Sequence, residues 1–462
     1  MNNSNNKSRR ERWFEAFKIY RRPQVVAMLF LGFSAGLPFL LVFSTLTAWL
    51  TEAGVTRTTI GFFSWIGITY SIKFFWAPVV DQVKLPILHR LLGLRRSWML
   101  LAQLGIATGL LLMASTDPLN ELPFLAFCGL LVAFSSATQD VSVDAYRIEA
   151  VVEEYQAAMS ASYVLGYRLA LLVAGAGAFY IAEFSSWQWC YSIMAGLMLI
   201  GIVTVLFVKE PEGDKVRVKS KFEEKIDRLI ASGAQQPTKF EQLIRRFSDA
   251  VVGPFADFFR RNGIYALLIL LFISVYRISD ITMGVMANPF YLDMGFSKIQ
   301  IADITKVFGF FMTIAGSALG GVMVVIWGVR PVLVLGATLV ASTNLLFAMM
   351  AATASKSLLV LALVVSADNL SGGLASVAFI AYLSGLTSST YTATQYALFS
   401  SLMTLPGKFI GGFSGWMVDS AGYTWFFVAA SIMGVPAILL SIALWFHDDK
   451  RGVIKSEAKV SV

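Results

Sequence analysis

The chain has 462 residues, of which 56% are hydrophobic and only 14% are charged, and its formal net charge is +8. A soluble domain carries about a quarter of charged residues, so this composition excludes an ordinary soluble protein and indicates a membrane protein. The excess of basic residues suits an anionic membrane surface rather than nucleic acid.

Apolar runs long enough to cross about 30 Å of hydrocarbon predict twelve transmembrane helices in two groups of six. The first group occupies 24–208 and the second 262–446, with a polar linker at 209–261 between them. Short polar tails at 1–23 and 447–462 flank the two groups. The predicted fold is an all-α membrane protein of two six-helix bundles. The predicted spans are 24–50, 58–80, 97–116, 122–147, 157–183, 189–208, 262–290, 298–327, 331–354, 357–386, 391–418 and 422–446.

Basic residues outside the spans are unevenly divided between the two sides of the membrane. The tails, the linker and the loops on their side hold 29 lysines and arginines, whereas the opposite loops hold only Arg57, Lys298 and Lys356. Because basic loops remain in the cytoplasm, we expect both termini to be cytoplasmic.

The two halves contain similar loops. "LTEAGVTRTTIG" (50–61) and "YLDMGFSKIQIA" (291–302) match in an acid, a glycine, a hydroxyl, a cation and an isoleucine, 241 residues apart. A second pair, Arg168 and Lys408, is 240 residues apart. This agreement predicts a parallel duplication of a six-helix unit.

Catalytic signals are absent from the sequence. The two cysteines and two histidines lack the spacing of a metal site, and we find no nucleophile motif or phosphate-binding loop. We therefore expect no catalytic residue, metal or cofactor. A coupled transporter, rather than a membrane enzyme or a channel, best accounts for the duplication and for the charges inside the spans.

Ionisable side chains in the middle of a span are costly unless paired or hydrated, so they are candidates for function. Asp140 lies deep in the fourth span, and Arg168 lies at similar depth in the fifth. A buried aspartate whose partner can withdraw changes its proton affinity with conformation, as proton coupling requires. A static Asp140–Arg168 bridge that only orients two helices is the alternative.

The second half contributes two more carboxylates at mid-span. Asp280 lies one turn from Arg277 in the seventh span, and Asp368 precedes Asn369 in the tenth. Both join Asp140 as candidates for proton coupling. An intrahelical Arg277–Asp280 pair is equally compatible with the spacing.

Several segments between residues 23 and 448 carry distinctive motifs. They include "TIGFFSWIGITYSIKFFWAPVVD", "FSSATQDVSVDAYR", "SYVLGYRLALLV", "DNLSGGLASVAFIAYL" and "TATQYALFSSL". Together they resemble the AmpG family of muropeptide permeases, a branch of the major facilitator superfamily. The positions that match are Gly36, Gln139, Asp140, Asp144, Arg168, Asp368 and Gln395.

The resemblance implies proton-driven import of 1,6-anhydromuropeptides across the inner membrane of a Gram-negative bacterium. It also implies a role in cell-wall recycling and in β-lactamase induction. Related permeases handle siderophores, so a permease for another substrate, such as a siderophore, is the alternative.

Charges near the cytoplasmic ends of the spans resemble gate residues of the superfamily. Asp81 ends "WAPVVD" and Arg95 opens "RRSW", as in the acid–glycine–basic loop that latches the cytoplasmic gate. Asp144 and Arg147, three residues apart at the inner end of the fourth span, are typical of a solvated or gate-closing ion pair. The equivalent loop of the second half keeps Arg330 but lacks an acid.

A muropeptide offers hydroxyl, amide and carboxylate groups, which need polar partners and flat apolar faces in a cavity. Arg168 or Arg277 would bind a carboxylate, because a guanidinium binds it bidentately. We expect substrate, protons and the lipid bilayer as partners, no nucleic acid, and a monomer. The candidate substrate-binding residues are Gly36, Tyr70, Gln139, Tyr167, Arg168, Arg277, Asn369 and Gln395.

Overall fold

The computed structural model describes residues 21–151, 156–211, 257–386 and 392–450. Every regular element within these ranges is a helix, since a helix satisfies its backbone polar groups internally inside a bilayer. The predicted all-α architecture is confirmed. The tail up to residue 20, the linker from 212 to 256 and the tail from 451 lie outside the described residues.

The helices fall into two sets along the chain. The first set is α2 (Pro23–Leu41), α3 (Ser44–Glu52), α4 (Arg57–Phe63), η1 (Ser64–Gly67), α5 (Ile68–Ser71), η2 (Lys73–Phe75), α6 (Ala77–Gln82), α7 (Leu88–Leu92), α8 (Leu94–Ala114), α9 (Leu122–Glu149), α10 (Gln156–Leu172), η4 (Val173–Gly177), α11 (Ala178–Phe184), α12 (Trp187–Leu197) and α13 (Leu199–Phe207). The second set is α16 (Tyr265–Val275), α17 (Ile278–Asp293), α18 (Lys298–Ile301), η5 (Ala302–Phe308), α19 (Gly309–Trp327), α20 (Val329–Ala352), α21 (Leu358–Leu386), α22 (Thr392–Gly411), α23 (Ser414–Met433) and α24 (Val435–Lys450).

Ten helical stretches in the described part of the chain are long and apolar enough to cross a membrane. The predicted spans 58–80 and 391–418 are not among them. The 3₁₀ turns η1 and η2 break the first into short helices, and α22, in the second, carries Pro406 and Lys408. Both segments lie where the two halves meet, so they bury polar groups against protein instead of presenting a full apolar surface to lipid.

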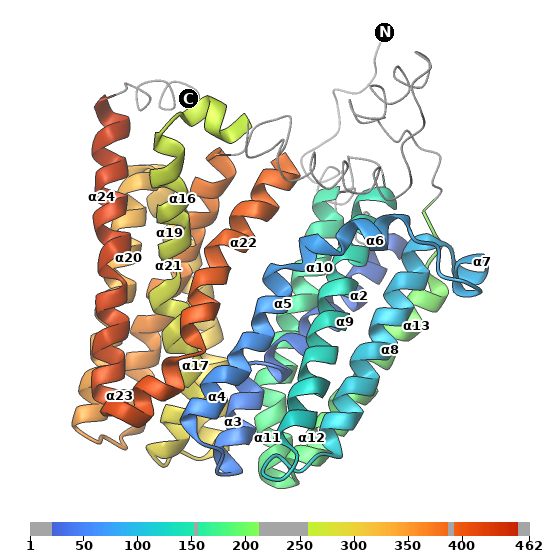
Figure 1. The fold of residues 1–462 in the computed structure, drawn as a ribbon, viewed down its shortest axis with the longest axis horizontal. Coiled ribbons are helices and arrows are strands. Elements are labelled where there is room, and N and C mark those ends of the chain that lie inside the picture. Colours follow the sequence, from blue (N-terminus) through green and yellow to red (C-terminus); the bar gives the residue numbers. More distant parts are fainter. Residues whose placement is uncertain (1–20, 152–155, 212–256, 387–391, 451–462) are drawn as a thin grey trace, which may run out of the picture.

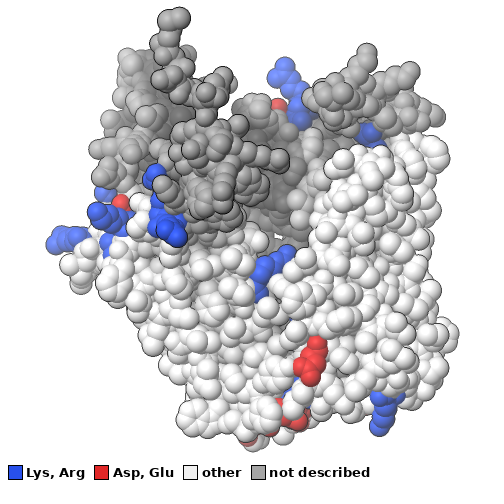
Figure 2. All heavy atoms as spheres, turned by 180° about the vertical axis from the view of Figure 1, so that it is seen from behind, with Lys and Arg blue, Asp and Glu red and all other residues white. Residues whose placement is uncertain are grey.

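The two halves lie side by side and diverge toward one end (Figure 1). At the other end α3 contacts α17, and α4 contacts α23. We call this the closed end; it carries the loops after α3 and α17. Seen from behind, the surface is hollowed between the halves on the side away from the closed end (Figure 2). A cavity of about 630 Å³ lies there between α10 and α19.

The two loops at the closed end have the same backbone conformation. Gly54 and Gly295 both have a φ of +86°, in the left-handed region that glycine adopts without strain. The next helix then starts with a hydroxyl cap in each loop, at Thr56 and at Ser297. The predicted duplication therefore extends to local structure.

Two ion bridges join the halves at the closed end. Arg57 donates to Asp293 from Nη2 at 2.7 Å and from Nε at 3.1 Å, and Lys298 donates to Glu52 at 2.7 Å. Glu52 and Asp293 are equivalent positions of the repeat, as are Arg57 and Lys298. Each bridge is thus the symmetry copy of the other: an acid of one half meets the base of the other half.

Small residues let α4 and α23 approach closely beside these bridges. A side chain on Gly415 would collide with the carbonyl oxygen of Arg57, and one on Gly61 would lie 2.6 Å from the carbonyl oxygen of Gly412. Asp419 accepts hydrogen bonds from the backbone nitrogen and hydroxyl of Thr58 at 2.8 and 2.7 Å, which caps the start of α4.

Gly36 allows a similar close approach of two helices inside the first half. A Cβ at this position would lie 2.6 Å from the carbonyl oxygen of Tyr167, because α2 and α10 pack backbone against backbone. Gly36 is buried in this contact.

Removal of one bridge should loosen the closed end, since a partly exposed ion pair stabilises a contact by up to about 1 kcal/mol. We expect Arg57→Gln or Lys298→Gln to raise the population of molecules in which the closed end has opened by up to about fivefold. The double variant should raise this population more than either single change. The reporter is the rate at which a water-soluble thiol reagent labels a cysteine placed at Val55, which is buried in the loop after α3, with Cys128 and Cys190 replaced by alanine.

Two controls accompany this measurement. The exchanged pair Arg57→Asp with Asp293→Arg should return the labelling rate toward that of the parent. Arg261→Gln, which breaks a 3.0 Å pair with Asp257 in the same half, should leave the rate unchanged. Identical rates in the parent and in the double variant would show that the bridges do not hold this end closed.

Gly36→Ala should destabilise the protein by about 1–3 kcal/mol, the typical cost of overpacking. Gly196 in α12 has open space around its would-be Cβ, so Gly196→Ala should be neutral or slightly stabilising. Thermal unfolding of the two purified variants checks this difference. Equal transition temperatures would contradict the packing role of Gly36.

Candidate functional site

Asp140, in α9, pairs with Lys73 of η2, and 3.4 Å separates Oδ2 from Nζ. Its other oxygen, Oδ1, is buried without a hydrogen-bond partner among the described residues. Arg168 is instead exposed and lines the cavity between α10 and α19, so the predicted Asp140–Arg168 bridge is wrong. The break in the second span explains the difference, because η2 places Lys73 against α9.

Gln139, beside Asp140, is completely buried behind this pair. Its Nε2 donates to the hydroxyl of Ser34 at 3.3 Å, and Gln103 donates to the same hydroxyl at 3.3 Å. The amide oxygens of Gln139 and Gln103 make no hydrogen bond within the described chain. This arrangement joins α9, α2 and α8 and leaves acceptors that a water or a ligand can satisfy.

The aromatic candidates lie on the second and fifth spans. The ring of Tyr70 lies 5.8 Å from those of Phe39 and Phe43, and its hydroxyl is buried without a partner among the described residues. Tyr167 is half-buried, with its ring 6.1 Å from that of Tyr163. Tyr70 thus combines a stacking face with an unused hydroxyl, as sugar binding requires.

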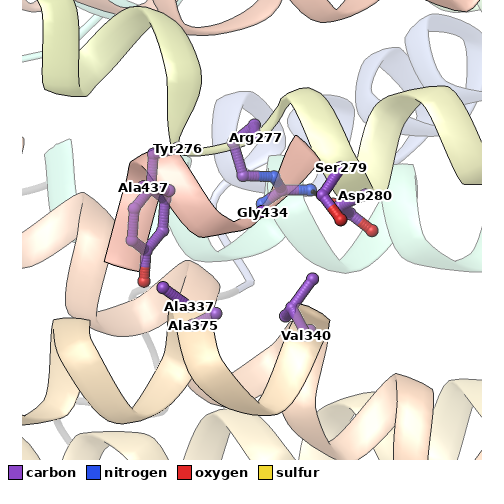
Figure 3. Close-up of a pocket in the computed structure, with 10 residues that line it drawn as sticks. Tyr276, Arg277, Ser279, Asp280, Ala337, Val340, Ala375, Gly434 and Ala437 are labelled. Atoms are coloured by element: carbon purple, nitrogen blue, oxygen red, sulfur yellow. Dashed lines mark ion pairs between the residues drawn. The ribbon is translucent and has the colours of Figure 1, made fainter. Parts of the chain in front are cut away.

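In the second half, Arg277 and Asp280 form an ion pair (Figure 3). Arg277 follows the break between α16 and α17, and its Nη1 donates to Ser376 at 2.8 Å. The adjoining cavity measures about 10 Å³, which is room for about one water. It is too small for a sugar, so Arg277 does not face a ligand-sized space in this conformation.

Asp368 and Asn369 have different surroundings. Asp368 accepts a hydrogen bond from Thr343 at 3.3 Å and has no ion pair within the described residues. The amide oxygen of Asn369 accepts from Thr313 at 2.7 Å, and its nitrogen donates to the carbonyl of Val365 at 2.9 Å. Asn369 therefore fastens α21 to α19, whereas Asp368 remains an unpaired acid.

The described gate candidates lie at the ends of α8 and α9 that are away from the closed end. Asp144 and Arg147 form the expected intrahelical pair at 3.4 Å, and Arg147 also donates to Ser160 at 2.5 Å. Arg95 pairs with Glu149 at 2.7 Å, which ties α8 to α9. Sequence reasoning missed Glu149, although its place at the end of "DAYRIE", beside Arg147, offered the signal. The side chains of Asp81 and Gln395 lie outside the described residues.

The chain is similar to known transporters over most of its length. The family description Major Facilitator Superfamily matches residues 28–302. A putative transporter AmpG 4 of Rickettsia conorii is 31% identical over 431 residues, covering 92% of this chain and 98% of the relative. The anhydromuropeptide permease of Escherichia coli (strain K12) is 32% identical over 425 residues, covering 92% and 80%.

Solved structures agree in fold. A crystal structure of the peptide transporter POT has a TM-score of 0.66 at 13% identity and covers 92% of this chain and 94% of that chain. A D-xylose-proton symporter has a TM-score of 0.63 at 11% identity, with 92% and 96% covered. Together with the paired halves and the cavity between them, these similarities show that the chain is a member of the AmpG branch of the major facilitator superfamily.

Proposed function

We propose that this protein imports anhydromuropeptides, GlcNAc linked to 1,6-anhydroMurNAc with or without a stem peptide, together with protons. The similarity over 92% of the chain to a relative named anhydromuropeptide permease supports the substrate. The cavity of about 630 Å³ falls within the roughly 300–1,000 Å³ usual for small-molecule sites. Import would serve cell-wall recycling and β-lactamase induction.

The proposed location is the bacterial inner membrane, with both termini in the cytoplasm. The distribution of lysine and arginine between the loops supports this orientation. The closed end then faces the periplasm and the cavity faces the cytoplasm. In this proposal the bundles 24–208 and 262–446 move against each other as two bodies of a monomer, and the linker 209–261 connects them.

The surroundings of Asp140 are the observation that supports proton coupling. Asp140 is a carboxylate inside a membrane span, and one of its oxygens pairs with Lys73. The other oxygen has no hydrogen-bond partner among the residues that the structure describes. Uptake of a proton would release Lys73, so protonation and the contact between the second and fourth spans depend on each other. Asp368, which has no ion pair among the described residues, is the second candidate, and Asp280 the third because Arg277 holds it.

The remaining roles follow from position. Arg168 lines the cavity and, with Tyr70 and Gln139, belongs to the proposed ligand contacts. Asp144 and Arg147, at the inner end of α9, belong to the proposed cytoplasmic gate. Arg95 contributes to the same gate through Glu149, and Asp81 is assigned to it from the motif alone.

Asp140→Asn should abolish accumulation driven by the proton gradient while exchange of substrate across the membrane continues. One proton moving through 100 mV supplies about 2.3 kcal/mol, which corresponds to about 45-fold accumulation. Uptake of labelled anhydromuropeptide into vesicles with an imposed gradient measures this ratio, which should fall to about one in the variant.

Asp117→Asn is the matched control, because Asp117 lies exposed in the loop between α8 and α9. It should accumulate substrate as the parent does. A variant at Asp140 that still concentrates substrate, and loses it when an uncoupler is added, would transfer the coupling role to Asp368 or Asp280.

A further inference from the structure

Two lysines of the second half reach across to the first half. Lys306, in the π-helical turn η5, lies 5.5 Å over the ring of Phe179. Lys408, in α22, donates to the hydroxyl of Ser71 at 2.9 Å and lies 5.9 Å over the ring of Tyr70. Both ammonium groups therefore sit at the boundary between the halves.

Lys306 is also tied to the first half through an amide. Its Nζ donates to the side-chain oxygen of Asn288 at 3.0 Å. The nitrogen of the same amide donates to the backbone carbonyl of Ser44, where α3 begins. Asn288 thus links Lys306 to the break between α2 and α3.

Along the boundary between the second and eleventh spans, Lys408 and Thr404 share Ser71 as their partner in the first half, and these are the innermost hydrogen bonds before the halves diverge. From the closed end inward the cross-half hydrogen bonds are Thr58 to Asp419, Trp65 to the carbonyl of Phe409, and Ser71 to Thr404 at 2.8 Å. No cross-half hydrogen bond lies farther inward along these two segments in the described residues.

Lys306 occupies the matching place between the fifth and eighth spans. Tyr180 donates to Asp303 nearer the closed end, and Lys306 follows one turn inward. Beyond it the cavity separates Leu172 from Phe310. The two lysines therefore lie near the level at which the halves begin to separate, one on each of the two boundaries between the halves.

The charges of these lysines are not compensated within the described chain. Lys73 and Arg277 each have a carboxylate partner, but no described acid lies within ion-pair distance of Lys306 or Lys408. Their partners are a neutral amide or hydroxyl and the face of an aromatic ring, which attracts a cation weakly. Each ammonium group has three N–H donors and uses one in these hydrogen bonds.

We propose that Lys306 and Lys408 bind the negatively charged group of the transported ligand, a carboxylate, where the two halves begin to separate. An anion placed there would take up the remaining donors and neutralise charges that a membrane interior otherwise disfavours. The buried hydroxyls of Tyr70 and Ser44, which have no hydrogen-bond partner among the described residues, are the adjacent groups for the ligand's sugar oxygens. The identity of the ligand rests on the proposed function; the anion site does not.

The arginines are less suited to this task in the conformation described. Arg277 is held by Asp280, beside a space for about one water. Arg168 faces a part of the cavity whose other lining residues are mostly apolar, including Leu165, Leu169 and Ile314.

The test compares two ligands on the purified full-length protein. One is GlcNAc-1,6-anhydroMurNAc with its lactyl carboxylate free, and the other is the same disaccharide with that carboxylate amidated. The parent should bind the acid about tenfold to a hundredfold more tightly than the amide, the range expected for a charged hydrogen-bonded pair. Lys306→Gln and Lys408→Gln should each lose most of this preference, and the arginine substitutions at the same positions should keep part of it.

Lys356→Gln is the control, because Lys356 is exposed in the loop before α21; it should keep the full preference. A preference that survives both lysine changes, or that only Arg168→Gln removes, would overturn the proposal. A parent that binds acid and amide equally would also overturn it while leaving the proposed substrate intact.

A second measurement separates the anion site from the choice of substrate. Thermal unfolding is followed in sodium lactate and in sodium chloride at equal ionic strength. The parent should unfold at a higher temperature in lactate, by mass action on the folded state, and the two glutamine variants should show no difference. If neither disaccharide binds the parent, the proposed substrate is wrong, and the comparison of lactate with chloride then tests the anion site alone. Equal transition temperatures of the parent in the two salts would refute the anion site.

Discussion

The two bridges at the closed end, Arg57–Asp293 and Lys298–Glu52, determine how the rest of the structure is arranged. They hold the loops after α3 and α17 together, so in this conformation the halves separate toward the opposite end. Gly415 and Gly61 then allow α4 and α23 to meet at backbone distance. The position of the cavity, and the level at which Lys306 and Lys408 contact the first half, agree with this closure.

Charges inside the spans divide into two kinds. Arg277 and Asp280 neutralise each other within one helix, and such a pair can persist through a rigid movement of the half. Lys73 and Asp140 come from different spans, and Lys408 contacts the other half. The contact of Lys408 changes when the two halves move as bodies, and the contact of Lys73 with Asp140 changes when the second span moves against the fourth. These contacts can therefore link ligand, proton and conformation.

Much of the architecture could be predicted from the sequence, because apolar length and repeated loops are local properties of the chain. The all-α class, ten of the spans and the equivalence of Gly54 with Gly295 required no knowledge of packing. The partner of Asp140 could not be predicted in the same way. Depth along a straight helix favoured Arg168, whereas the turns η1 and η2 bring Lys73 to the carboxylate. Likewise, the repeat was visible in the sequence. The sequence could not predict that the acid of each repeat pairs with the base of the other repeat, because this pairing depends on how the two halves face each other.

That crossed pairing has a consequence for the history of the chain. When an acid and a base occupy equivalent positions and each contacts its counterpart in the other copy, the surface is complementary to itself. This is the geometry of an isologous contact in a two-fold dimer. Two separate copies of the six-helix unit would form both bridges at once, without any change to either copy. The crossed pairing is therefore the contact that a duplication of the six-helix unit would leave at the closed end.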